Sequence, residues 1–216
     1  DCLSSNCTLS LCADSNKICP NECNSGDGTC TFIDSNTGFT LPACPAQDFG
    51  CYAKCVCNIN RYGKDCSLDS DEWTSARSSR ESLCTALRDN MAIQDLTEDV
   101  VSGRATSVAD LFSDMHLISD VALEDCTAVL TETVSTAPEL AQDFAVASEI
   151  TAALSLILDR AKYDEYGVSS SLLSEIYASL ALLAQGCQGN LAIGETPMNF
   201  VDENLRMAVA MTDSIT

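Results

Sequence analysis

The stretch Cys-Val-Cys-Asn-Ile-Asn-Arg-Tyr-Gly-Lys-Asp-Cys, residues 55–66, decides how the N-terminal part of the chain is built. Cys55 and Cys57 are separated by one residue, so they cannot easily bond to each other and must reach toward different parts of the chain. A turn at Tyr62 and Gly63 then folds the last segment back toward them. This arrangement predicts a compact unit that is held together by disulfide bonds.

Eleven of the 14 cysteines lie in residues 1–66, and only Cys84, Cys126 and Cys187 lie in the other 150 residues. A segment of this size cannot bury enough apolar surface to fold unaided, so we expect structural disulfides made in an oxidising compartment. Zinc is the alternative, but the single histidine, His116, lies 50 residues beyond the last of these cysteines in a helical pattern. The sequence therefore predicts an extracellular or cell-surface protein without a metal site.

The net charge of −21 is unevenly distributed. Residues 1–70 carry 8 acidic and 4 basic residues, whereas residues 71–216 carry 24 and 7. Such a surface repels nucleic acid and anionic membranes, and its simplest interpretation is a solvated acidic coat. No apolar run is long enough to span a bilayer. Because the chain opens at Asp1 and ends at Thr216 within an apolar-polar alternation, we expect a processed or truncated piece of a longer polypeptide.

Residues 19–30 read Cys-Pro-Asn-Glu-Cys-Asn-Ser-Gly-Asp-Gly-Thr-Cys, with two glycines suited to a turn before a hairpin. This pattern resembles the opening half of an EGF-like domain, and residues 55–66 resemble its closing half, so the resemblance covers about residues 19–66. It implies three disulfides, each stabilising the fold by roughly 2–4 kcal/mol. They are Cys19 with Cys30, Cys23 with Cys55, and Cys57 with Cys66.

The chain departs from the EGF-like pattern at residues 31–54, where the family usually has a short hairpin. We interpret this segment as an inserted loop, which leaves the register of the hairpin open. Cys44 and Cys51 lie inside it and are expected to close a local loop around Pro45 and Gly50.

Calcium is the one ion that the resemblance raises. Calcium-binding EGF-like modules carry an acid just before the first cysteine, but residues 14–17 read Asp-Ser-Asn-Lys, so Lys17 places a cation where a carboxylate is needed. Asp34 and Phe39 match the second half of that signature only in part. We therefore expect no cofactor, and we expect these residues to form a turn that is closed by its own hydrogen bonds. Bound calcium is the alternative.

Two weak modification signals accompany the module. Asn6 opens an Asn-Cys-Thr sequon in the cysteine-containing N-terminal segment, residues 1–18. Thr29 stands just before the third cysteine of the module, where some EGF-like domains carry O-fucose.

After a short linker, residues 67–72, apolar residues recur at intervals of three and four through residues 73–187. This periodicity predicts a helical domain of about five helices in a bundle or layer. We expect them over about 73–94, from 97, from 119, over about 136–166, and over about 169–186. The start at 136 is indicated by Thr136, Pro138 and Glu139, which have the spacing of a capping box.

Cys84 and Cys126 lie on apolar faces of the first and third predicted helices, and we expect them to form a bridge. Cys187 then remains with Cys2, Cys7 and Cys12. Its partner in the N-terminal segment, or in another chain, stays open.

Residues 188–216 change character, because a turn at 194–197 precedes an alternation of apolar and polar residues that predicts β-strands. Together with the helices, Gly-Glu-x-Pro at 194–197 and Asn-Leu-Arg at 204–206 resemble the passage from the helical to the β subdomain of GAIN-type regions. These occur in polycystin, egg-jelly-receptor-like and adhesion-receptor ectodomains. The resemblance covers about residues 71–216. It implies that most of the β subdomain, and any autoproteolysis site, lie beyond this chain.

No sequence pattern indicates catalysis. His116 has no partner pattern for a catalytic triad, and the acidic pairs Glu98 with Asp99 and Glu124 with Asp125 are expected to solvate helix faces. We therefore do not expect an enzyme.

The preferred hypothesis is an extracellular structural or adhesive protein that acts through contacts with other extracellular proteins, by self- or hetero-assembly. A surface coat or a filament such as a flagellar hair (mastigoneme), some of whose proteins contain EGF-like modules, would suit it. The alternative is the ectodomain fragment of a membrane receptor or polycystin-like channel. A secreted EGF-like ligand fits less well, because the attached helical domain is larger than the module.

Overall fold

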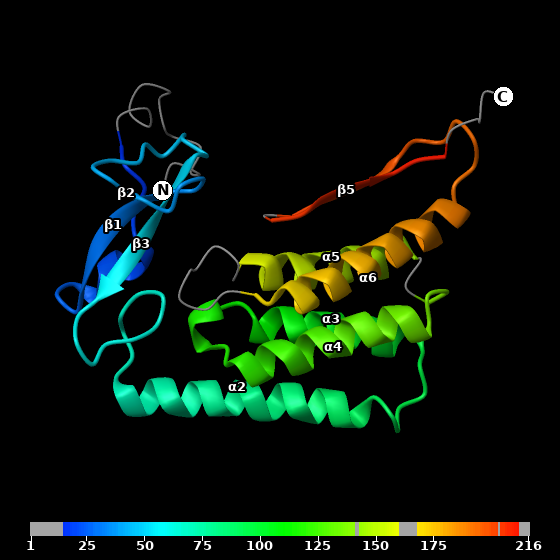
Figure 1. Cartoon of the computed structure of the whole chain (residues 1–216), viewed down its shortest axis with the longest axis horizontal. Coiled ribbons are helices and arrows are strands. Elements are labelled where there is room, and N and C mark those ends of the chain that lie inside the picture. The colour runs from blue at the N-terminus through cyan, green and yellow to red at the C-terminus, as the bar shows by residue number, and fades with distance from the viewer. Residues whose placement is uncertain (1–14, 141–142, 160–167, 203, 212–216) are drawn as a thin grey trace. The chain divides into compact units, whose positions relative to one another are not determined.

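The computed structural model of the chain describes residues 15–140, 143–159, 168–202 and 204–211. The chain divides into two compact units, Asp1–Ser75 and Ala76–Thr216, with the boundary inside a helix. We refer to them as the cysteine-rich unit and the helical unit. The layout of a disulfide-rich segment with small antiparallel strands, then five helices and C-terminal strands, agrees with the predicted fold class (Figure 1).

The cysteine-rich unit contains a three-stranded antiparallel sheet in the order β2-β1-β3. The two long strands pair from Gly28 opposite Cys57 to Asp34 opposite Cys51. The predicted insertion at 31–54 is therefore wrong at both ends, because its β-prone residues extend the sheet and only residues 35–50 connect the two long strands. The elements are η1 (Pro20–Asn24), β1 (Gly28–Asp34), β2 (Thr40–Leu41) and β3 (Cys51–Cys57).

Helix α2 (Ser70–Asn90) begins earlier than predicted and shortens the linker. The Asp69 side chain accepts hydrogen bonds from the backbone N–H groups of Asp71 and Glu72, and the Glu72 carboxylate accepts from the Asp69 N–H. This reciprocal capping box satisfies donors that would otherwise lack partners. The Trp73 ring in the first turn stacks on Tyr62 with centroids 4.8 Å apart. The first turn of α2 is thus packed into the cysteine-rich unit.

The helical unit is layered. Helices α3 and α4 form a layer between α2 and the pair α5 and α6, and the β4-β5 hairpin lies beyond that pair (Figure 1). Its largest fully buried side chains come from α3 to α6 and the α3-α4 connection. None of the described helices is long and apolar enough to cross a membrane. The elements are α3 (Glu98–Leu111), η2 (Met115–Leu117), α4 (Asp120–Thr136), α5 (Phe144–Asp159), α6 (Ser170–Gly189), β4 (Met198–Val201) and β5 (Arg206–Val209).

The predicted helix start at 136–139 is wrong. Helix α4 continues through Thr136, because its buried face, which includes Leu130 and Val134, must stay against the core. The helix ends at Thr136, and Ala137, the residue before Pro138, is its non-helical C-cap, because a helical conformation is disfavoured before proline. Helix α5 begins instead at Phe144, after Asp143 accepts hydrogen bonds from two N–H groups of its first turn. Tertiary packing has overridden a good local signal.

Helix α6 begins as predicted, with Ser169 as its cap, but it passes through Gly186 to Gly189 because Leu183 and Cys187 both face the core. The predicted C-terminal strands are confirmed as the hairpin β4-β5. The Asn204 N–H donates to Ser155 Oγ on α5 at 2.9 Å, which helps to hold the hairpin against the helices. The predicted end of the α5 helix near residue 166 lies outside the described residues.

Asp125 clamps α2 to α4. It accepts hydrogen bonds from Thr85 Oγ1 and Arg88 Nη1, each at 2.7 Å, beside the disulfide between Cys84 and Cys126. The prediction that Asp125 only solvates a helix face is therefore wrong. Burial alone would raise the pKa of this carboxyl, but the hydrogen bonds from Arg88 and Thr85 and the arginine charge outweigh it and lower the pKa.

Asp125→Asn should destabilise the helical unit by about 1 kcal/mol at neutral pH, since Arg88 is half exposed and the charged pair is partly screened. Because the pKa of Asp125 is lower in the folded chain than in the unfolded chain, where it is about 3.9, the carboxylate stabilises the fold at pH values above that value. This stabilisation is lost as the pH falls through the folded-state pKa. The difference from wild type, measured by urea unfolding with far-UV circular dichroism, should therefore shrink below about pH 4. Glu124→Gln, at the exposed neighbour, is the control and should change little. Equal effects of both variants would contradict the clamp.

Candidate functional site

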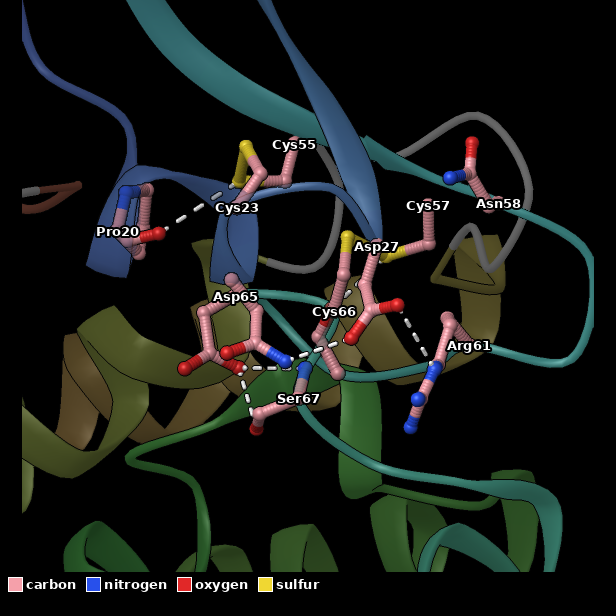
Figure 2. The surroundings of a disulfide bond; sticks show 12 residues. Pro20, Cys23, Asp27, Cys55, Cys57, Asn58, Arg61, Asp65, Cys66 and Ser67 are labelled. Carbon is pink, nitrogen blue, oxygen red and sulfur yellow. Dashed lines mark hydrogen bonds and ion pairs between the residues drawn. A yellow bond between two sulfur atoms is a disulfide. The ribbon is translucent and has the colours of Figure 1, made fainter.

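Four disulfides link the described residues of the cysteine-rich unit, and Figure 2 shows Cys23–Cys55 and Cys57–Cys66. Their Cα–Cα distances of 5.2 to 5.9 Å are ordinary for disulfides. The other two are Cys19–Cys30 and Cys44–Cys51. These pairings, and the bridge between Cys84 and Cys126 in the helical unit, are the ones expected from the sequence. Cys187 is buried on α6, and Cys2, Cys7 and Cys12 lie outside the described residues.

Sulfur atoms form the core of this unit. Cys19, Cys23, Cys55 and Cys66 are buried together, with Ala53 and Cys57 packed against them. The sulfurs of Cys19, Cys23 and Cys55 lie within 4.8 Å of one another, a spacing that three metal ligands could have. Each of these sulfurs is already bonded to another sulfur, whereas a metal requires thiolates. The cluster is therefore two neighbouring disulfides.

Gly28 at the start of β1 allows this packing. A Cβ atom at this position would lie 2.5 Å from Cys66 Sγ and 3.0 Å from the Val56 carbonyl oxygen. Both neighbours are fixed, one by a disulfide and the other by the sheet. The second glycine of the Gly-x-Gly-x-Cys pattern is thus required because the Cys57–Cys66 disulfide approaches the backbone closely.

The segment before this glycine has an unusual backbone. Residues 21–25 have φ values between +35° and +54°, so five consecutive non-glycine residues adopt the left-handed conformation. Left-handed residues cost roughly 1–2 kcal/mol each, and asparagine, present at 21 and 24, tolerates them best. The disulfides at Cys19 and Cys23 anchor this turn to the sheet.

Polar contacts join the left-handed turn to the loop that follows β3 (Figure 2). Asp27 pairs with Arg61 Nε at 3.2 Å, and Asn58 Nδ2 donates to the Gly26 carbonyl at 2.8 Å. Asp65 accepts hydrogen bonds from Ser67 and, at 3.3 Å, from Asn21 Nδ2. Burial would raise the pKa of Asp65, but the hydrogen bonds from Ser67 and Asn21 outweigh it and lower the pKa.

The residues considered for calcium are engaged with the protein. Asn16 Oδ1 accepts from the Cys44 N–H, and Lys17 Nζ donates to the Cys51 carbonyl at 2.7 Å. Asp34 Oδ1 accepts from the N–H groups of Asn36 and Thr37, and these bonds lower its pKa. This arrangement closes the turn after β1. Asp14, like the sequon residue Asn6, lies outside the described residues, and Thr29 is exposed on β1.

The disulfide core leaves large apolar side chains at the surface, a feature that sequence reasoning missed. Phe39 and Phe49 are 74% and 95% exposed. They come from the same end of the sheet, because Asp34 donates to the Phe39 carbonyl and the next residue, Ser35, donates to the Gly50 carbonyl beside Phe49. We call these two side chains the loop-end aromatics. The signal in the sequence was two phenylalanines in a segment, residues 35–50, that shows no alternating apolar pattern.

The acids and the histidine weighed for catalysis are dispersed. His116 lies half-buried in η2, where its N–H donates to Asp114, and Asp125 belongs to the clamp of α2 and α4. Glu98 and Asp99 occupy the first turn of α3 after the cap residue Thr97, where acidic residues favour the helix start. These positions explain the acids structurally.

The chain matches no protein-family model, no curated protein and no solved structure.

Gly28→Ala should destabilise the cysteine-rich unit by about 1–3 kcal/mol, because the added methyl group meets fixed atoms. Guanidinium unfolding followed by the fluorescence of Trp73, the single tryptophan, measures this. Gly103→Ala in α3, where the added Cβ meets nothing within 4 Å, should stabilise the helical unit by about 0.5–1 kcal/mol. An unchanged midpoint for Gly28→Ala would show that the close approach is wrong.

Glu22→Gly should raise the midpoint of the same transition, because glycine removes a left-handed strain of roughly 1–2 kcal/mol while costing about 0.5–1 kcal/mol in chain entropy. Glu22 is exposed, so no packing is lost. Glu22→Ala keeps the Cβ atom and serves as the control, with no gain expected. A loss of stability in Glu22→Gly that exceeds the loss in Glu22→Ala would contradict the left-handed turn.

Proposed function

We propose that this chain is an extracellular structural or adhesive protein, which acts through protein contacts as a building block of a surface coat or of a filament such as a flagellar hair. In this proposal residues 19–66 form an EGF-like module with an enlarged loop, and no catalytic step is involved. The observation that carries it is a unit whose interior is made of disulfides while two phenylalanines face outward.

The disulfides support an extracellular location. Five bridges are formed among the described residues, and reducing compartments do not maintain so many structural disulfides. The disulfides also suit a building block that must stay folded in an assembly, since cross-links restrict the conformations of the unfolded chain.

The loop-end aromatics support the contact function. Buried aromatic anchors dominate binding at protein interfaces, and an exposed phenylalanine gains free energy when a partner covers it. Phe39 and Phe49 lie in a loop whose backbone is closed by the Cys44–Cys51 disulfide and by Asp34. A surface held in shape before binding loses less conformational entropy on association.

The alternative is the ectodomain fragment of a membrane receptor or polycystin-like channel with a GAIN-type region. The β4-β5 hairpin packed on α5 and α6 favours it, because such a region joins a helical subdomain to β-strands. The coding sequence that flanks these 216 residues separates the two. Repeated modules without membrane spans favour the filament, whereas a proteolysis motif followed by spans favours the receptor.

Self-association tests the preferred function. In sedimentation experiments over a concentration series, the wild-type chain should form larger species, and Phe39→Ser with Phe49→Ser should weaken association at least about tenfold, since a buried aromatic anchor typically contributes more than 1 kcal/mol. Ile93→Ser removes an apolar side chain that is 79% exposed in the helical unit, and it should leave association unchanged.

The structural role would be overturned if the wild-type chain remained a monomer at high concentration and if the native protein were also found only as a monomer. Equal weakening by Ile93→Ser and by the double variant would remove the loop-end aromatics as the contact surface.

A further inference from the structure

Arg104 on α3 is a buried cation with neutral partners. The residue is 4% exposed, its Nη1 donates to Thr133 Oγ1 at 2.9 Å, and its Nη2 donates to Gln94 Oε1 at 3.2 Å. The Nε–H has no acceptor among the described residues. The ion pairs found in that part of the chain involve other arginines. Arg104 therefore has hydrogen-bond capacity, and a full charge, that the described residues do not satisfy.

This arrangement is costly without an anion. A guanidinium carries five N–H donors and does not deprotonate in proteins, even though burial lowers the pKa of Arg104. Removing a charge from water costs several kcal/mol unless an opposite charge and further hydrogen bonds replace the water. An oxygen anion at the guanidinium would supply both.

A cavity of about 460 Å³ gives access to this site, and it lies entirely within the helical unit. Arg104 and Thr133, both buried, form its floor. The exposed acids Asp89 and Glu132 belong to its rim, and Met91 and Leu96 make part of its wall apolar. The volume is in the range of small-molecule sites, which combine apolar walls with a few fixed polar groups.

The charges of the cavity restrict what can enter. Arg88 also lines the cavity, but it pairs with Asp125 at 2.7 Å and with Glu132 at 3.9 Å, which leaves Arg104 as the cation of the lining without an ion pair among the described residues. A cation alone would meet the Arg104 guanidinium on the floor, and a multiply charged anion such as phosphate would bring more negative charge than this one guanidinium offsets, beside the rim acids Asp89 and Glu132. A molecule with one carboxylate and one ammonium group satisfies both parts, since a carboxylate fits the planar donors of arginine and an ammonium group pairs with carboxylates.

We propose that the cavity bounded by α2, α3 and α4 binds a small zwitterion of the amino-acid class, with its carboxylate on Arg104 and its ammonium group facing Asp89 and Glu132. This site is independent of the loop-end aromatics and of the protein contacts proposed for them. The competing role for Arg104 is purely structural, as a brace between Gln94 and Thr133.

Nuclear magnetic resonance of the full chain, labelled with ¹⁵N-arginine, distinguishes the two roles. The Nε–Hε signal of Arg104 is assigned by its disappearance in Arg104→Lys, which has no such group. Glycine, alanine and leucine are titrated in turn, beside acetate, ethylammonium, phosphate and sodium chloride. At least one amino acid should shift the signal saturably, with an affinity at least about tenfold higher than that of acetate, because the ammonium group adds a charged hydrogen-bonded contact that acetate lacks.

Glu132→Gln should reduce amino-acid affinity about tenfold without reducing acetate affinity, because it removes a rim carboxylate that faces the ammonium group, together with the 3.9 Å contact of Glu132 with Arg88. Glu124→Gln, an exposed acid of the same helix that does not line this cavity, is the matched control. Equal affinities for acetate and every amino acid, or a shift that follows ionic strength alone, would overturn the proposal. The wild-type titrations decide this even if Arg104→Lys fails to fold.

Discussion

The Cys57–Cys66 disulfide lies against the backbone of Gly28, and the cysteine-rich unit depends on this close approach. The sheet brings Gly28 opposite Cys57, and the left-handed turn at 21–25 delivers the chain to that point while Cys23 reaches Cys55. The left-handed turn and the glycine at position 28 each cost conformational free energy. The completed disulfides offset that cost, so neither feature would be stable without them. Since sulfur fills the interior, apolar side chains such as Phe49 remain outside, and the contact function that we propose rests on this exposure.

The helical unit is stabilised by different means. Buried aliphatic side chains from α3 to α6 form one apolar core, and the Cys84–Cys126 disulfide with the Asp125 clamp attaches α2 to α4. Most of the net negative charge belongs to this part of the chain, which leaves the few arginines with distinct surroundings. Arg88 is half exposed and pairs with carboxylates, whereas Arg104 is buried and has only neutral acceptors. Both arginines line the same cavity, but only Arg104 lacks an anionic partner among the described residues, so Arg104 is the group to which we assign the ligand carboxylate.

Several predictions from sequence agree with the structure because local chemistry determines them. Thr97, Ser119 and Ser169 cap helices as expected, since a hydroxyl before an apolar periodic segment satisfies the first N–H groups wherever it occurs. The start predicted at Thr136 failed for the opposite reason. The buried face of α4 extends to that residue, and burial of Leu130 and Val134 outweighs a capping box. The extent of β1 and β3 was likewise missed, because strand pairing is a contact between distant segments.

The amino-acid sequence by itself determined the cysteine-rich and helical parts of the chain and, within the described residues, five helices, the C-terminal strands and five disulfide pairs, three of them through the resemblance. Spacing, periodicity and composition are properties of neighbouring residues, so they can be read without coordinates. Only the tertiary structure decided that Gly28 faces a sulfur atom, that Asp125 is a clamp and that Arg104 is buried at the floor of a cavity. How deeply a residue is buried and which distant residue it contacts depend on how helices and strands pack. Burial and contacts in turn set the free-energy cost of a buried charge or of an added methyl group.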